Sequence, residues 1–434
     1  MDVQFRKMLL LLGDALFMFA SLLLVVRLRF MDTWEPMIFW IHARAFWPLY
    51  PLWFVLLYTF DQYEIVRARF ARSRALFFAA LAVCFFVGLA YFYLVPHQRI
   101  TPKTNLLLHV AVFGALACAW RMFYFRHIAG SSPTTVGLME DDILTPRLSQ
   151  LVGEHRPVGY TAVLLNRQGD LSAQISQKRV AVFVIPSSFQ ADPSGATRLY
   201  DCFGAGAVFL EPVQLFELLE RTIPLETVDE RWCVRNIRER RAHWEGIAKR
   251  TVDVVVASLA LAVASPFCLL IAVAIKLDDG GPLFYRQQRV GLHGRQFEIV
   301  KFRSMREDAE RSGSQWAVPK DPRATRVGTW LRRTHVDELP QLVNILRGDI
   351  SFVGPRPERP EFVERLEREI PHYRLRHLIR PGFTGWAQVR MRYARSVSDS
   401  RAKFEYDLYY LKHRSLVLDG LIILKTARLL FRGE

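Results

Sequence analysis

The sequence has few cysteines and lacks the local patterns of a disulfide-stabilised, zinc-binding or RNA-binding protein. No two of its five cysteines are close in sequence: they are Cys84, Cys118, Cys202, Cys233 and Cys268. This spacing predicts neither a disulfide framework nor a cysteine-based metal cluster. Zinc-finger spacings and RNP-type aromatic motifs are also missing, and the arginines are spread along the chain. We therefore expect no nucleic-acid partner.

A cleavable signal peptide is not evident either. Arg6 and Lys7 precede a long apolar run without a clear small-residue cleavage site, so we expect a membrane anchor that is retained. Acidic residues are in the minority, because 42 Asp and Glu stand against 58 Lys and Arg, a net charge of +16, while 51% of the residues are hydrophobic. An apolar and basic chain is typical of a membrane protein whose charged parts face anionic lipid or polyphosphate substrates.

Four apolar stretches in residues 1–128 predict four transmembrane helices, at 8–26, 39–60, 75–95 and 105–120. Each is close to the ~20 residues that cross a bilayer. Four crossings return the chain to its starting side, which the arginines mark as the cytoplasm. These arginines are Arg67, Arg69, Arg72, Arg74, Arg121 and Arg126. We interpret Asp14 as reaching the membrane interface, with a functional intramembrane carboxylate as the alternative.

Residues 129–235 have the composition of a small soluble domain. Apolar runs at 161–165, 180–185 and 207–210 alternate with helix-like segments such as 212–221, which is the pattern of βα units. The segment Val136–Asp141 lacks the Gly-rich turn of a nucleotide-binding domain. We therefore interpret this domain as a scaffold or regulatory surface. Residues 236–250, rich in Arg and Glu, predict a charged linker helix.

A further membrane element covers residues 251–277 and contains Ser265 and Pro266 at its middle. As a straight helix it would be about 40 Å long, enough to cross a bilayer. Pro266 cannot donate to the carbonyl of Ala262 and kinks the helix, and Ser265 can satisfy the freed carbonyl. Two interpretations stay open: a re-entrant helix with both basic ends on the cytoplasmic face, or a kinked helix that crosses the membrane.

The most informative stretch is residues 332–357, in which Asp337 and Glu338 follow a basic pair and precede an apolar run and Gly-Pro-Arg-Pro. Carboxylates that hold a hard cation or attack phosphorus need neutralising charges nearby. A capping box is an open alternative, because Thr334 precedes Asp337 by three residues. A buried helical stripe that stops at Gly348 is expected in both cases, formed by Leu339, Leu342, Ile345 and Leu346.

Motifs in a fixed order follow the membrane element: Tyr285–Gly291, Phe297–Met305, Asp321–Arg323, Arg326–Gly328, Asp337–Gln341, Gly354–Pro357 and Arg380–Trp386. Together they resemble the bacterial sugar transferase family of monotopic polyprenyl-phosphate glycosyl-1-phosphate (phosphoglycosyl) transferases, over roughly residues 245–434. The N-terminal half resembles the large members of that family. Those members place four membrane spans and a Rossmann-like domain before the catalytic part.

The resemblance implies transfer of a sugar 1-phosphate from a UDP-sugar to a polyprenyl phosphate such as undecaprenyl phosphate, with release of UMP. This reaction initiates exopolysaccharide, capsule or O-antigen synthesis. The implied fold is a membrane protein of mixed α and α/β structure, with a degenerate Rossmann-like domain and a mainly helical catalytic domain at 251–434. The implied location is the bacterial inner membrane, with the catalytic domain on the cytoplasmic face of the lipid bilayer. A homodimer is expected by resemblance alone.

The resemblance also assigns roles to individual residues. The family's nucleophile falls on Asp337, with Glu338 beside it and Mg²⁺ at the pair. Its basic residues fall on Arg332 and Lys301, and its helix break falls on Ser265 and Pro266. We expect Arg356 to neutralise phosphates as well, and three arginines to contact either the diphosphate or lipid headgroups: Arg286, Arg289 and Arg303. The family commonly has Ser where this chain has His335, which either tunes the local charge or is inert.

Several alternatives stay open. A single-displacement transfer could replace a phosphosugar-aspartate intermediate, and a non-enzymatic lipid-binding scaffold could replace the enzyme. Residues 416–431 predict either an amphipathic helix on the membrane or a buried core helix. Asp253 is interpreted as a helix-start residue, with an arginine partner as the alternative.

Overall fold

The computed structural model describes residues 3–60, 62–63, 70–95, 102–128, 134–140, 142–156, 159–186, 189, 193–237, 243–306, 323–391 and 396–431. These residues form two compact units, Met1–Leu219 and Glu220–Glu434. Arg67 and Arg69 of the basic loop, and the predicted motif residues Asp321 and Pro322, lie outside the described residues.

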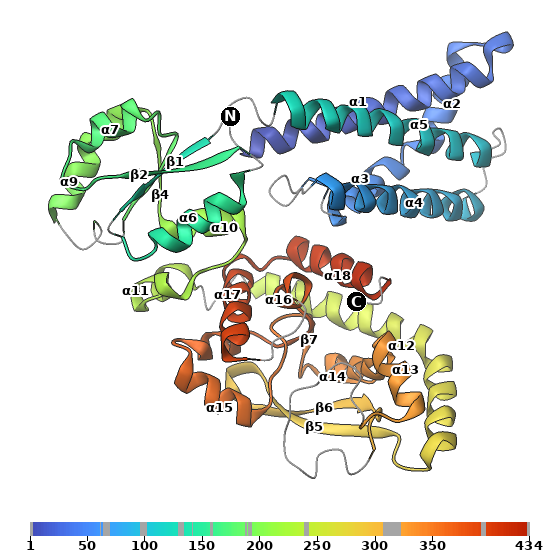
Figure 1. Ribbon diagram of the computed structural model, residues 1–434. Helices are drawn as coiled ribbons and strands as arrows, with labels where there is room; N and C mark the ends of the chain where they lie inside the picture. The colour runs from blue at the N-terminus through green and yellow to red at the C-terminus, as the bar shows by residue number, and fades with distance from the viewer. Residues whose placement is uncertain are drawn as a thin grey trace. The chain divides into compact units, whose positions relative to one another are not determined.

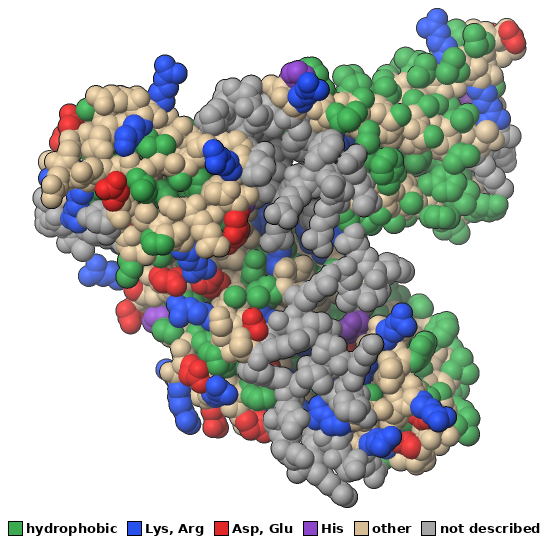
Figure 2. Space-filling view, in the orientation of Figure 1, with side chains coloured by type: hydrophobic (Ala, Val, Ile, Leu, Met, Phe, Trp, Pro, Cys, Tyr) green, Lys and Arg blue, Asp and Glu red, His purple; other side chains and the backbone are tan. Residues whose placement is uncertain are grey.

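Three long apolar helices form most of the N-terminal bundle (Figure 1): α1 (Val3–Arg29), α4 (Phe70–Leu94) and α5 (Pro102–Phe123). Their apolar stretches of 19–22 residues are long enough to cross a membrane, and hydrophobic side chains cover most of the bundle surface visible in Figure 2. α1 packs along α5. Arg121 bonds Asp14 and Arg29 bonds Asn105, so the two helices run antiparallel.

The second predicted span is not one continuous helix. It consists of α2 (Pro36–Phe46) and α3 (Leu49–Thr59), 11 residues each, separated by Trp47 and Pro48. Either helix is about 16 Å long, short of the roughly 30 Å hydrocarbon core. Together they lead from the end of α1 back to Tyr63, which bonds Asp14 in the first half of α1. The broken pair therefore makes one crossing of the bundle, and the four crossings return the chain to one end.

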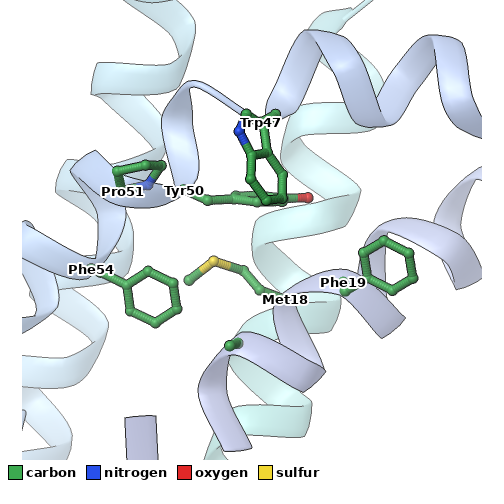
Figure 3. Close-up of a pocket in the computed structure, with 7 residues that line it drawn as sticks. Met18, Phe19, Trp47, Tyr50, Pro51 and Phe54 are labelled. Carbon is green, nitrogen blue, oxygen red and sulfur yellow. The ribbon is translucent and has the colours of Figure 1, made fainter. Parts of the chain in front are cut away.

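A cavity of about 440 Å³ lies beside this break. Residues of α1 and of the segment from Trp47 into α3 line it, and apart from the Tyr50 hydroxyl and the Trp47 indole N–H their side chains are apolar (Figure 3): Ala15, Met18, Phe19, Trp47, Tyr50, Pro51 and Phe54. The interruption of the crossing therefore leaves a hollow with apolar walls inside the bundle.

Asp14 is a buried ion-pair residue, so its predicted position at the membrane interface is wrong. Its carboxylate is 0% exposed, accepts two bonds of 2.6 Å from Arg121, and accepts a third of 2.8 Å from Tyr63. A buried charge in apolar surroundings is tolerated when a charged partner and hydrogen bonds compensate it. Because these partners come from α5 and from the segment after α3, the cluster joins three parts of the bundle.

The middle α/β domain is built on a parallel sheet with the order β2-β1-β3-β4. Its strands are β1 (Thr134–Met139), β2 (Tyr160–Leu165), β3 (Val182–Val184) and β4 (Val208–Leu210). Strands β2, β3 and β4 confirm the predicted strands. β1 was not predicted, because its segment was interpreted only as lacking a Gly-rich turn. The helices between and after the strands are α6 (Thr145–Glu154), α7 (Leu171–Gln177), α9 (Pro193–Asp201) and α10 (Pro212–Leu219).

Alternate residues of the strands face opposite layers of helix. Val136 and Leu138 of β1 pack with α6 and α10, whereas Met139 packs with α7. In β3, Val184 packs with α6 and α10, whereas Phe183 packs on the side of α7. This period of two is what a strand buried on both faces requires, so the domain is a three-layer sandwich (Figure 1).

The second unit starts with α11 (Glu230–Asn236) and the long helix α12 (His243–Asp279). Residues 243–250 of the predicted linker and the predicted membrane element are one uninterrupted helix with Pro266 inside it, and Figure 1 shows that this helix is bent. Ser265 Oγ donates to the carbonyl of Ala262 at 2.9 Å, which confirms the predicted rescue of that carbonyl. Only 11% of the apolar stretch of α12 is buried, against 33–39% for the three N-terminal helices, so most of its apolar side chains are not covered by the protein.

The rest of the second unit surrounds a β-hairpin and a short parallel strand pair. The hairpin is β5 (Phe284–Val290) with β6 (Gln296–Phe302), and β7 (Ser351–Val353) pairs with β8 (Gly382–Thr384). The helices are α13 (Arg326–Thr334), α14 (Gln341–Arg347), α15 (Pro360–Glu369), α16 (Trp386–Arg390), α17 (Val397–His413) and α18 (Leu416–Phe431).

The structure decides two predictions in this unit, one about α18 and one about Asp253. α18 buries Asp419, Ile422 and Lys425 at spacings of three while Val417 is 75% exposed, so one face of the predicted helix packs on the protein. Asp253 is not at a helix start, and among the described residues it has no arginine partner. Its carboxylate accepts bonds from Ser351 Oγ and the Phe352 amide, because α12 begins ten residues earlier and passes beside β7.

Candidate active site

Asp337 and Glu338 lie on a short 3₁₀ turn, η8 (Val336–Glu338), between α13 and α14. The turn begins at His335, whose left-handed backbone (φ 56°) ends α13. The capping-box interpretation is wrong, because the Thr334 hydroxyl donates back to carbonyls within α13 and α14 starts only at Gln341. The turn buries both carboxylates, which are 8% and 7% exposed.

The predicted helical stripe after the pair is confirmed. Leu342 and Ile345 are buried against α12, and α14 ends at Gly348 with a positive φ of 92°. Arg250 of α12 donates to the last carbonyls of α14, those of Ile345 and Leu346. α14 is therefore fixed on the membrane element, and so is the turn that precedes it.

Two cations share one oxygen of Glu338. Lys301 Nζ, on β6, donates to Oε1 at 2.6 Å, and Arg356 Nη2, from the Gly-Pro-Arg-Pro loop, donates to the same atom at 2.7 Å. Burial alone would raise the pKa of Glu338, but the charges and bonds of Arg356 and Lys301 outweigh it and hold the pKa well below its usual range. Glu338 is therefore ionised throughout the physiological range.

Asp337 is in a different electrostatic state. Burial raises the pKa of its carboxyl, Lys301 opposes that rise, and the adjacent Glu338 adds to it. The charges of His335 and Arg332 lower the pKa by smaller amounts. Within the described residues, the carboxylate of Asp337 accepts no hydrogen bond. Two neighbouring carboxylates thus differ in basicity, which is the usual way in which acidic pairs take separate roles.

Lys301 is held in place by a residue that the sequence reasoning missed. Asn344, fully buried on α14, accepts the Val300 amide at 3.1 Å and donates to the Glu298 carbonyl at 2.7 Å. These bonds join α14 to β6, the strand that carries Lys301. An asparagine within the apolar stripe Leu-Val-Asn-Ile-Leu was the available signal, because a buried amide there must find partners.

The other predicted basic residues have different surroundings. Arg332 lies in the last turn of α13, close enough for its charge to affect Asp337. Arg303 is buried and forms an ion pair with Asp279 at the end of α12. Arg286 pairs with Glu298 on the exposed hairpin, and Arg289 bonds the carbonyl of Pro357. Phosphate contact by Arg303 stays a prediction.

The acidic pair is compatible with a magnesium ion that a substrate helps to bind. Among the described residues, no group of three or more His, Cys, Asp and Glu side chains forms a metal site. Mg²⁺ commonly uses one or two carboxylates and takes its remaining ligands from water and substrate phosphates. Lys301 and Arg356 both bond Oε1 of Glu338, so Oε2 and the Asp337 carboxylate are the oxygens that fit this donor set.

Comparison with known proteins gives one consistent family. Residues 244–433 match the family model described as bacterial sugar transferase. A UDP-N-acetylgalactosamine-undecaprenyl-phosphate N-acetylgalactosaminephosphotransferase of Aeromonas hydrophila is 49% identical over 185 residues, 43% of this chain and 44% of the relative. A UDP-glucose:undecaprenyl-phosphate glucose-1-phosphate transferase of Xanthomonas campestris pv. campestris is 44% identical over 184 residues, 42% of this chain and 38% of the relative.

These two matches span less than half of each relative. A third relative, the exopolysaccharide production protein PSS of Rhizobium leguminosarum bv. phaseoli, is 44% identical over 188 residues, which are 42% of this chain and 93% of the relative. The match therefore covers nearly the whole of that protein, and the family-model match, residues 244–433, includes Asp337 and Glu338. The chain belongs to the bacterial sugar transferase family.

Proposed function

We propose that this chain transfers a sugar 1-phosphate from a UDP-sugar to undecaprenyl phosphate, releasing UMP and giving a lipid-linked diphosphate sugar. The observation that carries the proposal is the buried Asp337–Glu338 pair, with Lys301 and Arg356 bonded to Glu338. The names of the Aeromonas and Xanthomonas relatives, which describe transfer of sugar phosphates to undecaprenyl phosphate, support it. Such a product starts an exopolysaccharide, capsule or O-antigen pathway.

The donor diphosphate is strongly anionic, so a carboxylate can approach it only where positive charge neutralises it. Lys301 and Arg356 bond Glu338, and the charges of Lys301 and Arg332 lower the pKa of Asp337. Guanidinium groups suit this task because they bind phosphate through two parallel hydrogen bonds. Mg²⁺ held by Glu338 and Asp337 would supply further neutralisation of phosphate oxygens.

Asp337 is the better nucleophile of the two carboxylates. Glu338 is engaged by two cations and has a lowered pKa, whereas burial makes Asp337 more basic. In the proposed first step an Asp337 oxygen attacks the sugar-bearing phosphorus, and the bond from that phosphorus to the oxygen of UMP breaks. In the second step an oxygen of undecaprenyl phosphate attacks the same phosphorus, and the Asp337 carboxylate leaves.

The bend in α12 supports a re-entrant membrane helix. Its apolar side chains are largely unburied, and Ser265 satisfies the carbonyl that Pro266 frees. A helix that enters and leaves on the cytoplasmic face of the inner membrane would keep the catalytic unit where UDP-sugars are found. The parallel sheet of the middle domain supports a Rossmann-like scaffold role for that domain.

Asp337→Asn tests the reaction directly. We expect UMP release from a UDP-sugar and undecaprenyl phosphate to fall by at least about 10³-fold, because the amide cannot act as the nucleophile. Glu364→Gln, which removes one charge from the exposed face of α15, is the matched control and should keep activity. Retained transfer in Asp337→Asn would exclude a covalent role, and release of UDP instead of UMP would identify transfer of the sugar alone.

The acid limb of the pH–rate profile tests the coupling between Lys301 and Asp337. An acid with a raised pKa is protonated at higher pH, so activity that needs ionised Asp337 is lost earlier as pH falls. Lys301 lowers that pKa, so Lys301→Gln should move the acid limb of kcat/KM to higher pH. Arg365→Gln, on the solvent side of α15, should leave the limb in place. A limb that does not move in Lys301→Gln would contradict this coupling.

A tag at the C-terminus tests the re-entrant helix. We expect a protease- or label-accessible tag at residue 434 to be protected in intact cells, because both ends of a re-entrant helix face the cytoplasm. A tag inserted at residue 98, in the predicted outward loop between α4 and α5, provides the exposed control. Exposure of the C-terminal tag outside the inner membrane would show that α12 crosses it.

A further inference from the structure

The Gly-Pro-Arg-Pro loop that presents Arg356 to Glu338 is held almost entirely by its carbonyls. Pro355 and Pro357 have no amide hydrogen, so the loop has few donors of its own. Four consecutive carbonyls, 355 to 358, each accept a bond of 2.9–3.0 Å, and the donors come from three parts of the unit, β8, η9 and the end of β5. The donors are the Gly382 amide, Arg376 Nη2, Arg289 Nη1 and the Val290 amide, in that order.

Arg376 is the donor to the carbonyl of Arg356 itself. It lies on the 3₁₀ segment η9 (Tyr373–Leu378) and is only 6% exposed. Its guanidinium bonds the Arg356 carbonyl at 2.9 Å, Asp407 Oδ2 at 3.0 Å and Tyr373 Oη at 2.5 Å. It therefore fixes the backbone from which the Arg356 side chain extends toward Glu338.

Asp407 makes this arrangement possible, because a buried guanidinium needs a compensating charge. It projects from α17 and is 3% exposed. Burial raises the pKa of Asp407 to about 6, and Arg376 and Lys403 oppose that rise. Asp407 is therefore ionised at neutral pH and can keep Arg376 charged and oriented.

We propose that Arg376, oriented by Asp407, is a positioning residue that aims Arg356 at Glu338 and at the donor phosphates. The inference rests on the proposed function for its readout. It adds a line of contacts from α17 to the acidic pair: Asp407, Arg376, the Arg356 carbonyl, the Arg356 guanidinium and Glu338 Oε1.

A double-mutant cycle tests this proposal. The first change is Arg376→Gln together with Asp407→Asn, which removes both charges and so leaves neither one buried alone. The second is Arg356→Ala. In the presence of Arg356 we expect the paired change to lower kcat/KM for UMP release on the order of 10- to 100-fold, the size of effect that a small misplacement of a catalytic group produces. In the Arg356→Ala background the same change should have less than about a twofold effect.

UDP-sugar affinity, measured by calorimetry for the same set of variants, is the second readout of the double-mutant cycle. It needs no turnover and no lipid acceptor. The paired change should weaken binding when Arg356 is present and leave it unchanged when Arg356 is replaced. Arg401→Gln is the control and should change neither quantity. Arg401 lies on α17, as Asp407 does, and the substitution breaks an exposed ion pair with Glu226.

Equal losses in both backgrounds would overturn the proposal, because they would show that Arg376 acts through general stability and not through Arg356. No loss in either background would overturn it as well. A wild-type protein that binds UDP-sugar in this Arg356-dependent way but releases no UMP would contradict the proposed transfer while leaving the positioning role supported.

Discussion

The shared hydrogen bonding of Glu338 Oε1 is the interaction on which the catalytic unit depends. Lys301 comes from the β-hairpin, Arg356 comes from the loop after β7, and Glu338 comes from the turn between α13 and α14. Three segments far apart in the sequence therefore meet at one buried oxygen. Removing Glu338 would leave Lys301 and Arg356 facing one another without the carboxylate that neutralises both, which we expect to be more costly than losing a surface ion pair.

A second set of polar contacts fixes the long apolar helix α12 to the unit that carries the acidic pair. α12 has largely unburied apolar side chains, yet it is fastened to the site by polar contacts near its start. Arg250 bonds the end of α14, Asp253 bonds β7, and Lys249 pairs with Asp419 of α18. These contacts connect α12 to α14, which directly follows the acidic pair, and to β7 and α18.

The acidic pair shows how burial and charge can give adjacent carboxylates different properties. Both are less than 9% exposed, so desolvation acts on each. Lys301 and Arg356 donate hydrogen bonds directly to Glu338, and its pKa is lowered, whereas at Asp337 burial outweighs the nearby positive charges and the pKa is raised. The fold of one short turn therefore gives Glu338 a fixed, ionised carboxylate and gives the neighbouring Asp337 a more basic one.

Much of this organisation could be predicted from the sequence, because it is periodic or local. The apolar stripe of α14, the stop at Gly348 and the Ser265 bond to Ala262 all follow from spacing and from the chemistry of single residues. The missed features depend on partners distant in sequence. Asp14 could not be assigned without knowing that Arg121 lies beside it, 107 residues away. The capping box failed because His335 adopts a left-handed conformation, which residue type alone does not predict.

Arg376 and Asn344 belong to the same class of missed residue. Each is a buried polar side chain that bonds the backbone of another segment: Asn344 bonds two backbone groups of β6, and Arg376 bonds the Arg356 carbonyl as well as the Asp407 side chain. Nothing in the local sequence shows which segments these are. The sequence pattern indicated which residues carry charge to the site, and the tertiary contacts determine which of them hold the others in position.

The most direct test of the covalent role of Asp337 is isotope exchange in the absence of the lipid acceptor. Purified protein is incubated with UDP-sugar and radiolabelled UMP, and label is measured in the UDP-sugar pool. A phosphosugar carried on Asp337 predicts that label enters UDP-sugar in the absence of undecaprenyl phosphate, since UMP can reverse the first step. A protein that transfers sugar phosphate to the lipid but shows no such exchange would contradict the covalent role of Asp337.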